Sequence, residues 1–252
     1  MRILALVRQV LDAEENVRVR DGKVDLGASK LVLDTMDEYG VEEALRIREQ
    51  MPEAEVIVMA VGPPRCETSL RSALALGADR GILVETEEFL DVIAVSEVIA
   101  KVARREEIGL IFCGGQQADW DSQGLGAAVA EHLNWPQVTW ATALVVQDGQ
   151  LTGKHDVEEG TEMFAVALPA VVTTQQGLNE PRYPTLPNIM KAKRKELSRE
   201  PLESFGVKPK LSLARADVQI RERLRKVLDG RDASAAADQL VDLLRHEAKV
   251  LA

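Results

Sequence analysis

Residues 108–126 of the chain read IGLIFCGGQQADWDSQGLG. The apolar run Ile108–Cys113 predicts a buried strand, and the segment after the glycine-rich turn predicts a helix that continues to about Leu133. Ligands of open parallel sheets bind at turns of this kind, where the carboxyl end of a strand meets the next helix. The stretch therefore predicts both an α/β fold and a candidate ligand site.

Strands of the same character precede this one. Apolar runs rich in branched residues lie at Arg2–Val7, Glu55–Val61 and Gly81–Val84, and the segments between them carry apolar residues at helical spacing. Such alternation of strands and helices is typical of α/β domains. We expect a mostly parallel sheet with flanking helices on both faces.

The pattern changes in the second half of the chain. Alternating segments lie at Val138–Val146, Gln150–His155 and Thr161–Leu168, and the turn signals Asp148-Gly149 and Glu159-Gly160 join them. Because short turns of this kind connect neighbouring antiparallel strands, we predict an antiparallel meander in this region.

A last buried strand is expected at Ala170–Thr174, before the chain becomes irregular. Residues 179–187 hold three prolines, which exclude a regular helix or a central strand, so we expect the chain to leave the compact domain there. Farther on, Ala235–Val250 has one apolar face at helical spacing. We predict an α/β domain at 1–194 and a C-terminal helical arm at 195–252, which packs on its own domain or on a partner chain.

The composition is that of a folded globular protein. The chain has 252 residues, 46% of them hydrophobic and 29% charged, and its formal net charge of -10 argues against broad nucleic-acid binding. The apolar opening run is too short and too charged to insert into a membrane. Cys66 and Cys113 lie far apart in the sequence, so we expect no disulfide framework and a reducing, cytoplasmic location.

The glycine-rich turn suits a phosphate group. Ser122 or Asp121 can cap the helix, while Gly124 and Gly126 leave backbone N–H groups unshielded at the positive end of the helix dipole. The turn lacks the lysine of a P-loop and the spacing of a dinucleotide-binding GxGxxG motif. Two interpretations stay open: an adenine nucleotide bound without hydrolysis, or a glycine-rich connection without a ligand.

The sequence contains no recognisable catalytic motif. There is no GxSxG, HExxH or CxxC pattern, and we expect His132, His155 and His246 to be structural or exposed. Asp119 and Asp121 could hold a metal or a ribose hydroxyl, but two acids in a polar loop are more often solvated or capping. We expect no metal site and no catalysis by this chain itself.

Two longer runs carry a family resemblance. Leu168–Thr174 (LPAVVTT) and Leu178–Lys193 (LNEPRYPTLPNIMKAK) closely resemble the signature of the electron transfer flavoprotein beta subunit. Similar stretches elsewhere in the chain are Leu6–Val10, Val41–Leu45, Ala73–Gly81 and Asn134-Trp135-Pro136. The resemblance extends to about Lys195.

The resemblance implies an adenine nucleotide alpha hydrolase-like domain in a heterodimer with a larger alpha subunit, which holds most of a shared FAD. It also implies a structural AMP in this chain, as in the non-bifurcating members of the family. By position, the AMP site would comprise Leu6, Asp34, Thr35, Met36, Asp37, Val61, Gly115, Gln117, Asp119, Asp121, Ser122, Gln123, Gly124, Leu125 and Gly126. The loop is one residue shorter than the family's commonest form, and Ala13 and Met36 replace aromatic residues that some members place near the FAD.

The proline-rich segment gains a role from the same resemblance. Residues 179–193 would form a recognition loop whose Leu186 inserts into an apolar pocket of a partner dehydrogenase, and Pro184 and Pro187 would reduce the cost of ordering it. The implied contact residues are Tyr183, Pro184, Thr185, Leu186, Pro187, Asn188, Ile189, Met190 and Lys191. Electrons would pass from acyl-CoA dehydrogenases and related flavin dehydrogenases to the FAD and then to a membrane quinone reductase, which would place the chain in fatty acid beta-oxidation.

Two alternatives stand beside this interpretation. A bifurcating relative would bind a second FAD in place of AMP, and a stand-alone adenine-nucleotide-binding protein would resemble the stress-protein or pyrophosphatase types. The stand-alone types use other glycine and serine loop patterns and do not account for residues 179–193. The sequence of residues 185–193 is more similar to that of the non-bifurcating group.

Overall fold

The computed structural model describes residues 1–219 and 225–251 of the chain. The described residues belong to two compact units, Met1–Ala216 and Asp217–Ala252. Each unit is described by itself below.

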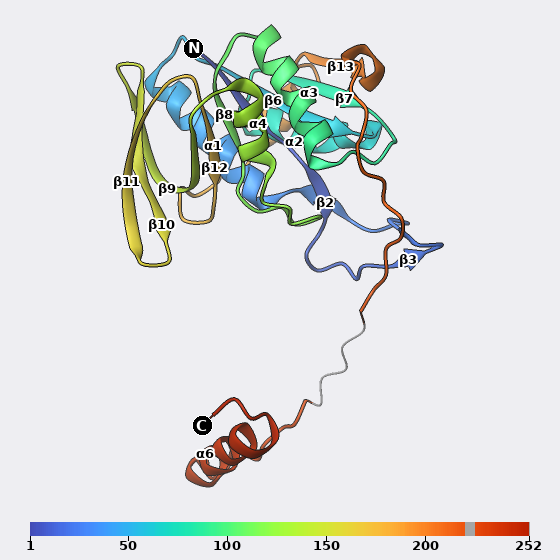
Figure 1. The fold of residues 1–252 in the computed structure, drawn as a ribbon, viewed down its shortest axis with the longest axis vertical. Helices are drawn as coiled ribbons and strands as arrows, with labels where there is room; N and C mark the ends of the chain where they lie inside the picture. The colour runs from blue at the N-terminus through green and yellow to red at the C-terminus, as the bar shows by residue number, and fades with distance from the viewer. Residues whose placement is uncertain (220–224, 252) are drawn as a thin grey trace. The chain divides into compact units, whose positions relative to one another are not determined.

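The first unit is built on a nine-stranded sheet with the order β11-β10-β9-β12-β8-β1-β6-β7-β13 (Figure 1). The strands of its parallel part are β1 (Arg2–Leu6), β6 (Glu55–Gly62), β7 (Arg80–Glu85), β8 (Ile108–Gly114), β12 (Ala170–Thr174) and β13 (Leu197–Pro201). The meander strands at one end are β9 (Gln137–Gln147), β10 (Gln150–Val157) and β11 (Gly160–Ala167). This arrangement confirms the mostly parallel α/β sheet and the antiparallel meander predicted from the sequence.

Helices cover both faces of the sheet. On one face lie α1 (Thr35–Gln50) and α2 (Glu67–Leu76), and on the other lie α3 (Val92–Arg105) and α4 (Leu125–Leu133). Successive side chains of a strand point to opposite faces.

Strand β1 shows how the two faces are filled. Ile3 and Ala5 join the apolar cluster under α1 and α2, whereas Leu4 and Leu6 join the cluster under α3 and α4. Both clusters consist mainly of buried aliphatic side chains, and burial of this kind is the main source of stability in such a domain. The carboxyl ends of the central strands are thereby fixed on a rigid base.

The sheet continues beyond residue 194, where the sequence placed the end of the α/β domain. Strand β13 pairs in parallel with β7, from Leu197 beside Gly81 to Pro201 beside Glu85. A short 3-10 helix, η2 (Leu202–Phe205), follows, and the compact unit runs to Ala216. The boundary therefore lies about twenty residues later than the sequence indicated, because one more edge strand joins the sheet.

The chain does not leave the compact unit at residues 179–187, so that expectation is wrong. Asn179 is buried, and the short helix α5 (Leu186–Ala192) begins inside the proline-rich segment. Pro187 is tolerated because it lies in the first helical turn, where a missing N–H breaks no helical hydrogen bond.

Smaller elements complete the first unit. Two short antiparallel pairs join β2 (Gln9–Leu11) to β5 (Leu31–Leu33) and β3 (Val19–Arg20) to β4 (Lys23–Val24). A 3-10 helix, η1 (Pro64–Cys66), precedes α2.

The second unit contains α6 (Ala233–Asp242), which continues into a π-type turn, η3 (Leu243–Glu247). Asp232 caps α6 by accepting hydrogen bonds from the N–H groups of Ser234 and Ala235, both at 3.1 Å. No residue of α6 or η3 is buried. The helix predicted at 235–250 is present as α6, but its regular part ends at Asp242.

No helix in the described part of the chain has the length and apolar character that crossing a bilayer requires.

Candidate functional site

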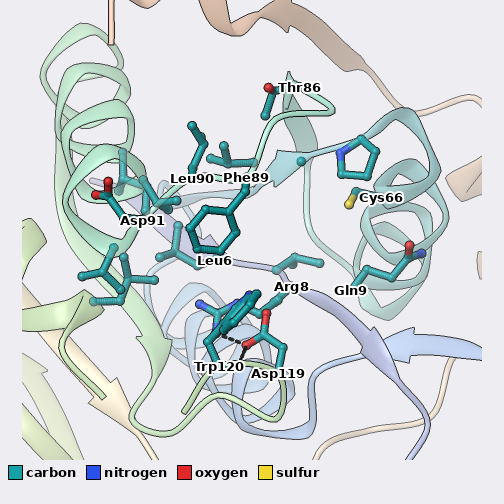
Figure 2. A pocket seen from close by; sticks show the side chains of 18 of the residues that line it. Leu6, Arg8, Gln9, Cys66, Thr86, Phe89, Leu90, Asp91, Asp119 and Trp120 are labelled. Atoms are coloured by element: carbon teal, nitrogen blue, oxygen red, sulfur yellow. Dashed lines mark hydrogen bonds and ion pairs between the residues drawn. The ribbon is translucent and has the colours of Figure 1, made fainter. Parts of the chain in front are cut away.

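A pocket of about 500 Å³ opens at the carboxyl edge of β1, β6, β7 and β8 (Figure 2). This is the edge at which open parallel sheets bind ligands. The residues that line the pocket are Leu6, Val7, Arg8, Gln9, Asp37, Met59, Val61, Gly62, Pro63, Arg65, Cys66, Thr86, Glu88, Phe89, Leu90, Asp91, Val92, Val95, Ile99, Asp119, Trp120, Ser122, Leu125 and Leu211.

The pocket is apolar on its floor and also carries charged residues, among them Arg8, Asp91 and Asp119. Leu6 and Val61 come from the ends of β1 and β6, and Val95 and Ile99 come from α3. Arg8 is the charged residue that follows β1 most closely. Ligand pockets commonly combine such an apolar lining with a few placed polar groups.

Arg8 is held by acidic neighbours. Its guanidinium donates to the Oδ1 atom of Asp119 at 3.1 Å, and its backbone N–H donates to the Oδ2 atom of Asp37 at 2.9 Å. Burial opposes the charge of Arg8, but Asp37 and Asp119 outweigh it and raise the pKa of the guanidinium. A fixed cation therefore lies beside the pocket.

Two buried carboxylates from the start of α1 hold the loop after β8. Asp37 accepts from the N–H of Gly114 at 2.8 Å, and Asp34 accepts from the N–H of Ala118 at 2.9 Å. Asp34 also caps α1 through the N–H of Met36 at 3.0 Å. Since these bonds join residues more than seventy positions apart, they lock the loop to the body of the domain.

Gln117 organises the loop from within. Its side-chain amide donates to the Gly114 carbonyl at 3.1 Å, and its Oε1 atom accepts from the Ser122 hydroxyl at 2.8 Å and from the Gln123 N–H at 3.0 Å. The residue is buried, so these three bonds satisfy a side chain that would be costly to bury alone.

The helix after this loop has no side-chain cap in the described structure, which corrects the predicted capping by Ser122 or Asp121. The N-cap residue of α4 is Gly124, and no side chain accepts from its first turn. Ser122 donates instead to Gln117, while Asp121 has a positive φ of 47° and accepts from the side chain of Gln123 at 3.1 Å. The first N–H groups of α4 therefore stay available to an anion.

The structure divides the residues implied for AMP into two groups. Leu6, Asp37, Val61, Asp119, Ser122 and Leu125 line the pocket. The remaining residues do not line it and lie at the start of α1, in the loop after β8 or at the start of α4: Asp34, Thr35, Met36, Gly115, Gln117, Asp121, Gln123, Gly124 and Gly126. For Asp34 and Gln117 the supporting role is explicit, because their side chains bond to backbone groups and to a side chain of the loop itself.

Sequence reasoning missed two prominent lining residues, Arg8 and Phe89, and gave no role of its own to Trp120, which lies within the loop implied for AMP. A tryptophan in a polar, glycine-rich loop is itself a signal, because a large aromatic side chain there has no core to join. Ala13 and Met36, the positions compared with flavin-facing aromatics, do not line this pocket; Ala13 is exposed, and Met36 packs close to Gly114.

The segment implied for partner recognition presents apolar side chains to solvent. Tyr183 is 93% exposed, Leu186 71% and Met190 65%. Thr185 caps α5 by accepting from the N–H of Asn188 at 3.4 Å. The expected loop is thus partly helical from Leu186 onward.

Residues of helix α1 hold this segment through hydrogen bonds and ion pairs. Arg182 donates to both carboxylate oxygens of Glu42, at 2.8 and 3.0 Å, and to Glu49 at 2.6 Å. Asn179 donates to Glu43 at 2.9 Å and to the Tyr39 carbonyl at 3.0 Å. The exposed apolar residues therefore project from a fixed base.

Comparison with known proteins decides the family. The model of the electron transfer flavoprotein domain matches residues 24–204, which include α1, the loop after β8 and the exposed segment. The chain belongs to the electron transfer flavoprotein family, as a beta subunit. The electron transfer flavoprotein subunit beta of Bradyrhizobium diazoefficiens is 39% identical over the full length of both chains.

Other electron transfer flavoprotein beta subunits agree. The Bacillus subtilis subunit is 34% identical over the full length of both chains. The human subunit is 41% identical over 204 residues, which cover 78% of this chain and 80% of the human one. The family resemblance drawn from residues 168–193 is confirmed.

Proposed function

We propose that this electron transfer flavoprotein beta subunit holds an AMP in the pocket, pairs with an alpha subunit that carries most of a shared FAD, and docks flavin dehydrogenases through the segment around Leu186. The nucleotide proposal rests on one observation: the apolar pocket reaches the first turn of α4, whose N–H groups have no side-chain cap. A nucleotide needs both, because its base is apolar on its faces and its phosphate is anionic.

The residues present fit such a ligand. The volume of about 500 Å³ falls within the range of small-molecule pockets. Leu125, the first residue of α4, lines the pocket, so the N–H groups of that turn would hold the phosphate without any catalytic side chain. Phosphate binding through backbone N–H groups also tolerates a loop that departs from the family's commonest form, because these donors remain when side chains are substituted.

FAD, when held between the two subunits, supplies one-electron transfer, and this chain contributes position only. The exposed apolar side chains of Tyr183, Leu186 and Met190 would enter a pocket of an acyl-CoA dehydrogenase or related flavin dehydrogenase. Because Arg182 and Asn179 already fix the segment, docking would order little chain and could be specific yet brief. A membrane quinone reductase would then accept the electrons.

Two further parts of the proposal concern assembly and location. The second unit, whose helix α6 buries none of its residues, would pack on the alpha subunit. Cys66 and Cys113 are both free and buried, in keeping with a reducing, cytoplasmic location. The role in fatty acid beta-oxidation would follow from docking acyl-CoA dehydrogenases.

Cofactor content tests the proposal directly. The chain is co-expressed with its alpha subunit, the complex is purified, and flavin and AMP are quantified after denaturation. We expect one FAD and one AMP per heterodimer. Two FAD without AMP would identify the bifurcating type, and a flavin-free monomer that hydrolyses ATP would refute the proposal.

A further inference from the structure

Two aromatic rings from different connections meet at the pocket. Phe89 follows β7 and Trp120 follows β8, and both line the pocket beside the apolar floor (Figure 2). Their ring centroids are 5.0 Å apart with the planes at 69°, an edge-to-face contact. Such a contact is a favourable geometry for aromatic pairs and fixes the two rings relative to each other.

Trp120 is unusual because it is ordered yet open to solvent. Its side chain is 54% exposed, although its loop is held by the buried side chains of Asp34 and Gln117. An indole that leaves this much apolar surface in water on a pre-ordered loop is suited to cover a ligand, because ligand binding removes that surface from water at little conformational cost.

The position of the indole is also linked to Arg8. The Oδ1 atom of Asp119 accepts from the Trp120 backbone N–H at 2.7 Å and from the Arg8 guanidinium at 3.1 Å. One carboxylate therefore holds both the Arg8 guanidinium and the backbone of Trp120 at the pocket. A ligand that contacts Arg8 meets an indole already in place.

We infer that Trp120, supported by Phe89, is the residue that selects an aromatic base in this pocket, by covering the face of the base opposite the aliphatic floor. The inference rests on the proposed nucleotide site. The floor residues Leu6, Val61 and Ile99 offer only apolar surface, which does not distinguish a base from any other apolar group. An aromatic face does, because base stacking on an aromatic ring adds a favourable term that aliphatic side chains lack.

The test compares a ligand with a base and a ligand without one. Purified full-length chain, freed of retained nucleotide by dialysis against charcoal, is titrated calorimetrically with AMP and with ribose 5-phosphate. Trp120→Ala should weaken AMP binding roughly 10-fold and leave ribose 5-phosphate binding within about 2-fold. Trp120→Phe should recover most of the AMP affinity, because the aromatic face is kept.

Met163→Ala is the control outside the pocket. Met163 is a large apolar residue of β11 that is 80% exposed and does not line the pocket, so its loss should change neither affinity. Equal weakening of AMP and ribose 5-phosphate by Trp120→Ala would show that Trp120 only holds the loop, and the inference would fail. AMP affinity unchanged in Trp120→Ala would overturn it as well, while the proposed nucleotide site would stand. A wild-type chain that binds no AMP at all would instead refute the site itself.

Discussion

The anchor of the exposed segment around Leu186 gives the sharpest prediction. Arg182 contacts Glu42 through two parallel N–H···O bonds and Glu49 through a third, and these side-chain bonds raise the pKa of its guanidinium. The Glu42 side chain is only 4% exposed. Replacing Arg182 by Ala leaves this buried carboxylate without its main partner, although Arg46 still donates to it at 3.2 Å.

The expected cost follows from that geometry. Breaking a buried ion pair costs about 3–5 kcal/mol, but Arg182 is itself 34% exposed and Arg46 compensates in part, so we expect about 2 kcal/mol. For a chain of this size that lowers the Tm by roughly 4–8 °C. The loss should also free the segment locally, since Arg182 immediately precedes its exposed residues.

Thermal unfolding of the purified complex measures the first effect, and amide hydrogen exchange over residues 186–192 measures the second. Arg199→Ala is the control, because Arg199 forms ion pairs with Glu67 and Glu85 that are more exposed. Exposed pairs contribute about 0–1 kcal/mol. If Arg182→Ala unfolds within 1 °C of the wild type and exchanges residues 186–192 no faster, the reasoning about this anchor is wrong.

Three other perturbations give separate tests. Gly126→Ala should destabilise the domain by about 1–3 kcal/mol in chemical denaturation, because a Cβ atom there would clash with Thr173, whereas Gly124→Ala meets only a contact at 3.5 Å and should be nearly neutral. Burial raises the pKa of Asp37 from its usual 3.8 to about 7, so its ionisation in that interval costs the folded state more than the unfolded one. The Tm of the wild type relative to Asp37→Asn should therefore fall as pH rises from about 4 to 7 and then level off; a difference independent of pH would contradict this. Leu186→Ala should slow electron transfer from the dehydrogenase about 10-fold or more, as expected for loss of an apolar anchor, with FAD content unchanged; unaltered kinetics would count against docking at this residue.

The local pattern of the sequence was enough to predict the sheet. The runs that became β1, β6, β7 and β8 differ from their predicted bounds by at most one residue at either end, because continuous apolar runs are what a strand buried on both faces requires. The strand-turn-helix pattern at residues 108–126 located the loop beside the pocket, and the family resemblance drew attention to the exposed segment around Leu186. The strands, the loop after β8 and the segment around Leu186 were predictable because each is marked by residues that are close together in the sequence.

What could not be predicted depends on partners far away in the chain. The bonds from Asp34 and Asp37 to the loop span 84 and 77 positions, and no local pattern reveals them. The capping prediction for Ser122 failed because the buried amide of Gln117 captures its hydroxyl. The segment at 179–187 stays in the domain because of similarly distant contacts, since Arg182 bonds to Glu42 and Glu49, which lie 140 and 133 positions upstream.

Helix α1 connects these distant contacts in one rigid element. Its N-terminal end holds the loop after β8 through Asp34 and Asp37. Its later turns hold the exposed segment around Leu186 through Glu42 and Glu49, which bond to Arg182. With 16 residues it is about 24 Å long. Exchanging the exposed segment alone would separate Arg182 from Glu42 and Glu49, so an engineered exchange of this segment should include α1 as part of the same block.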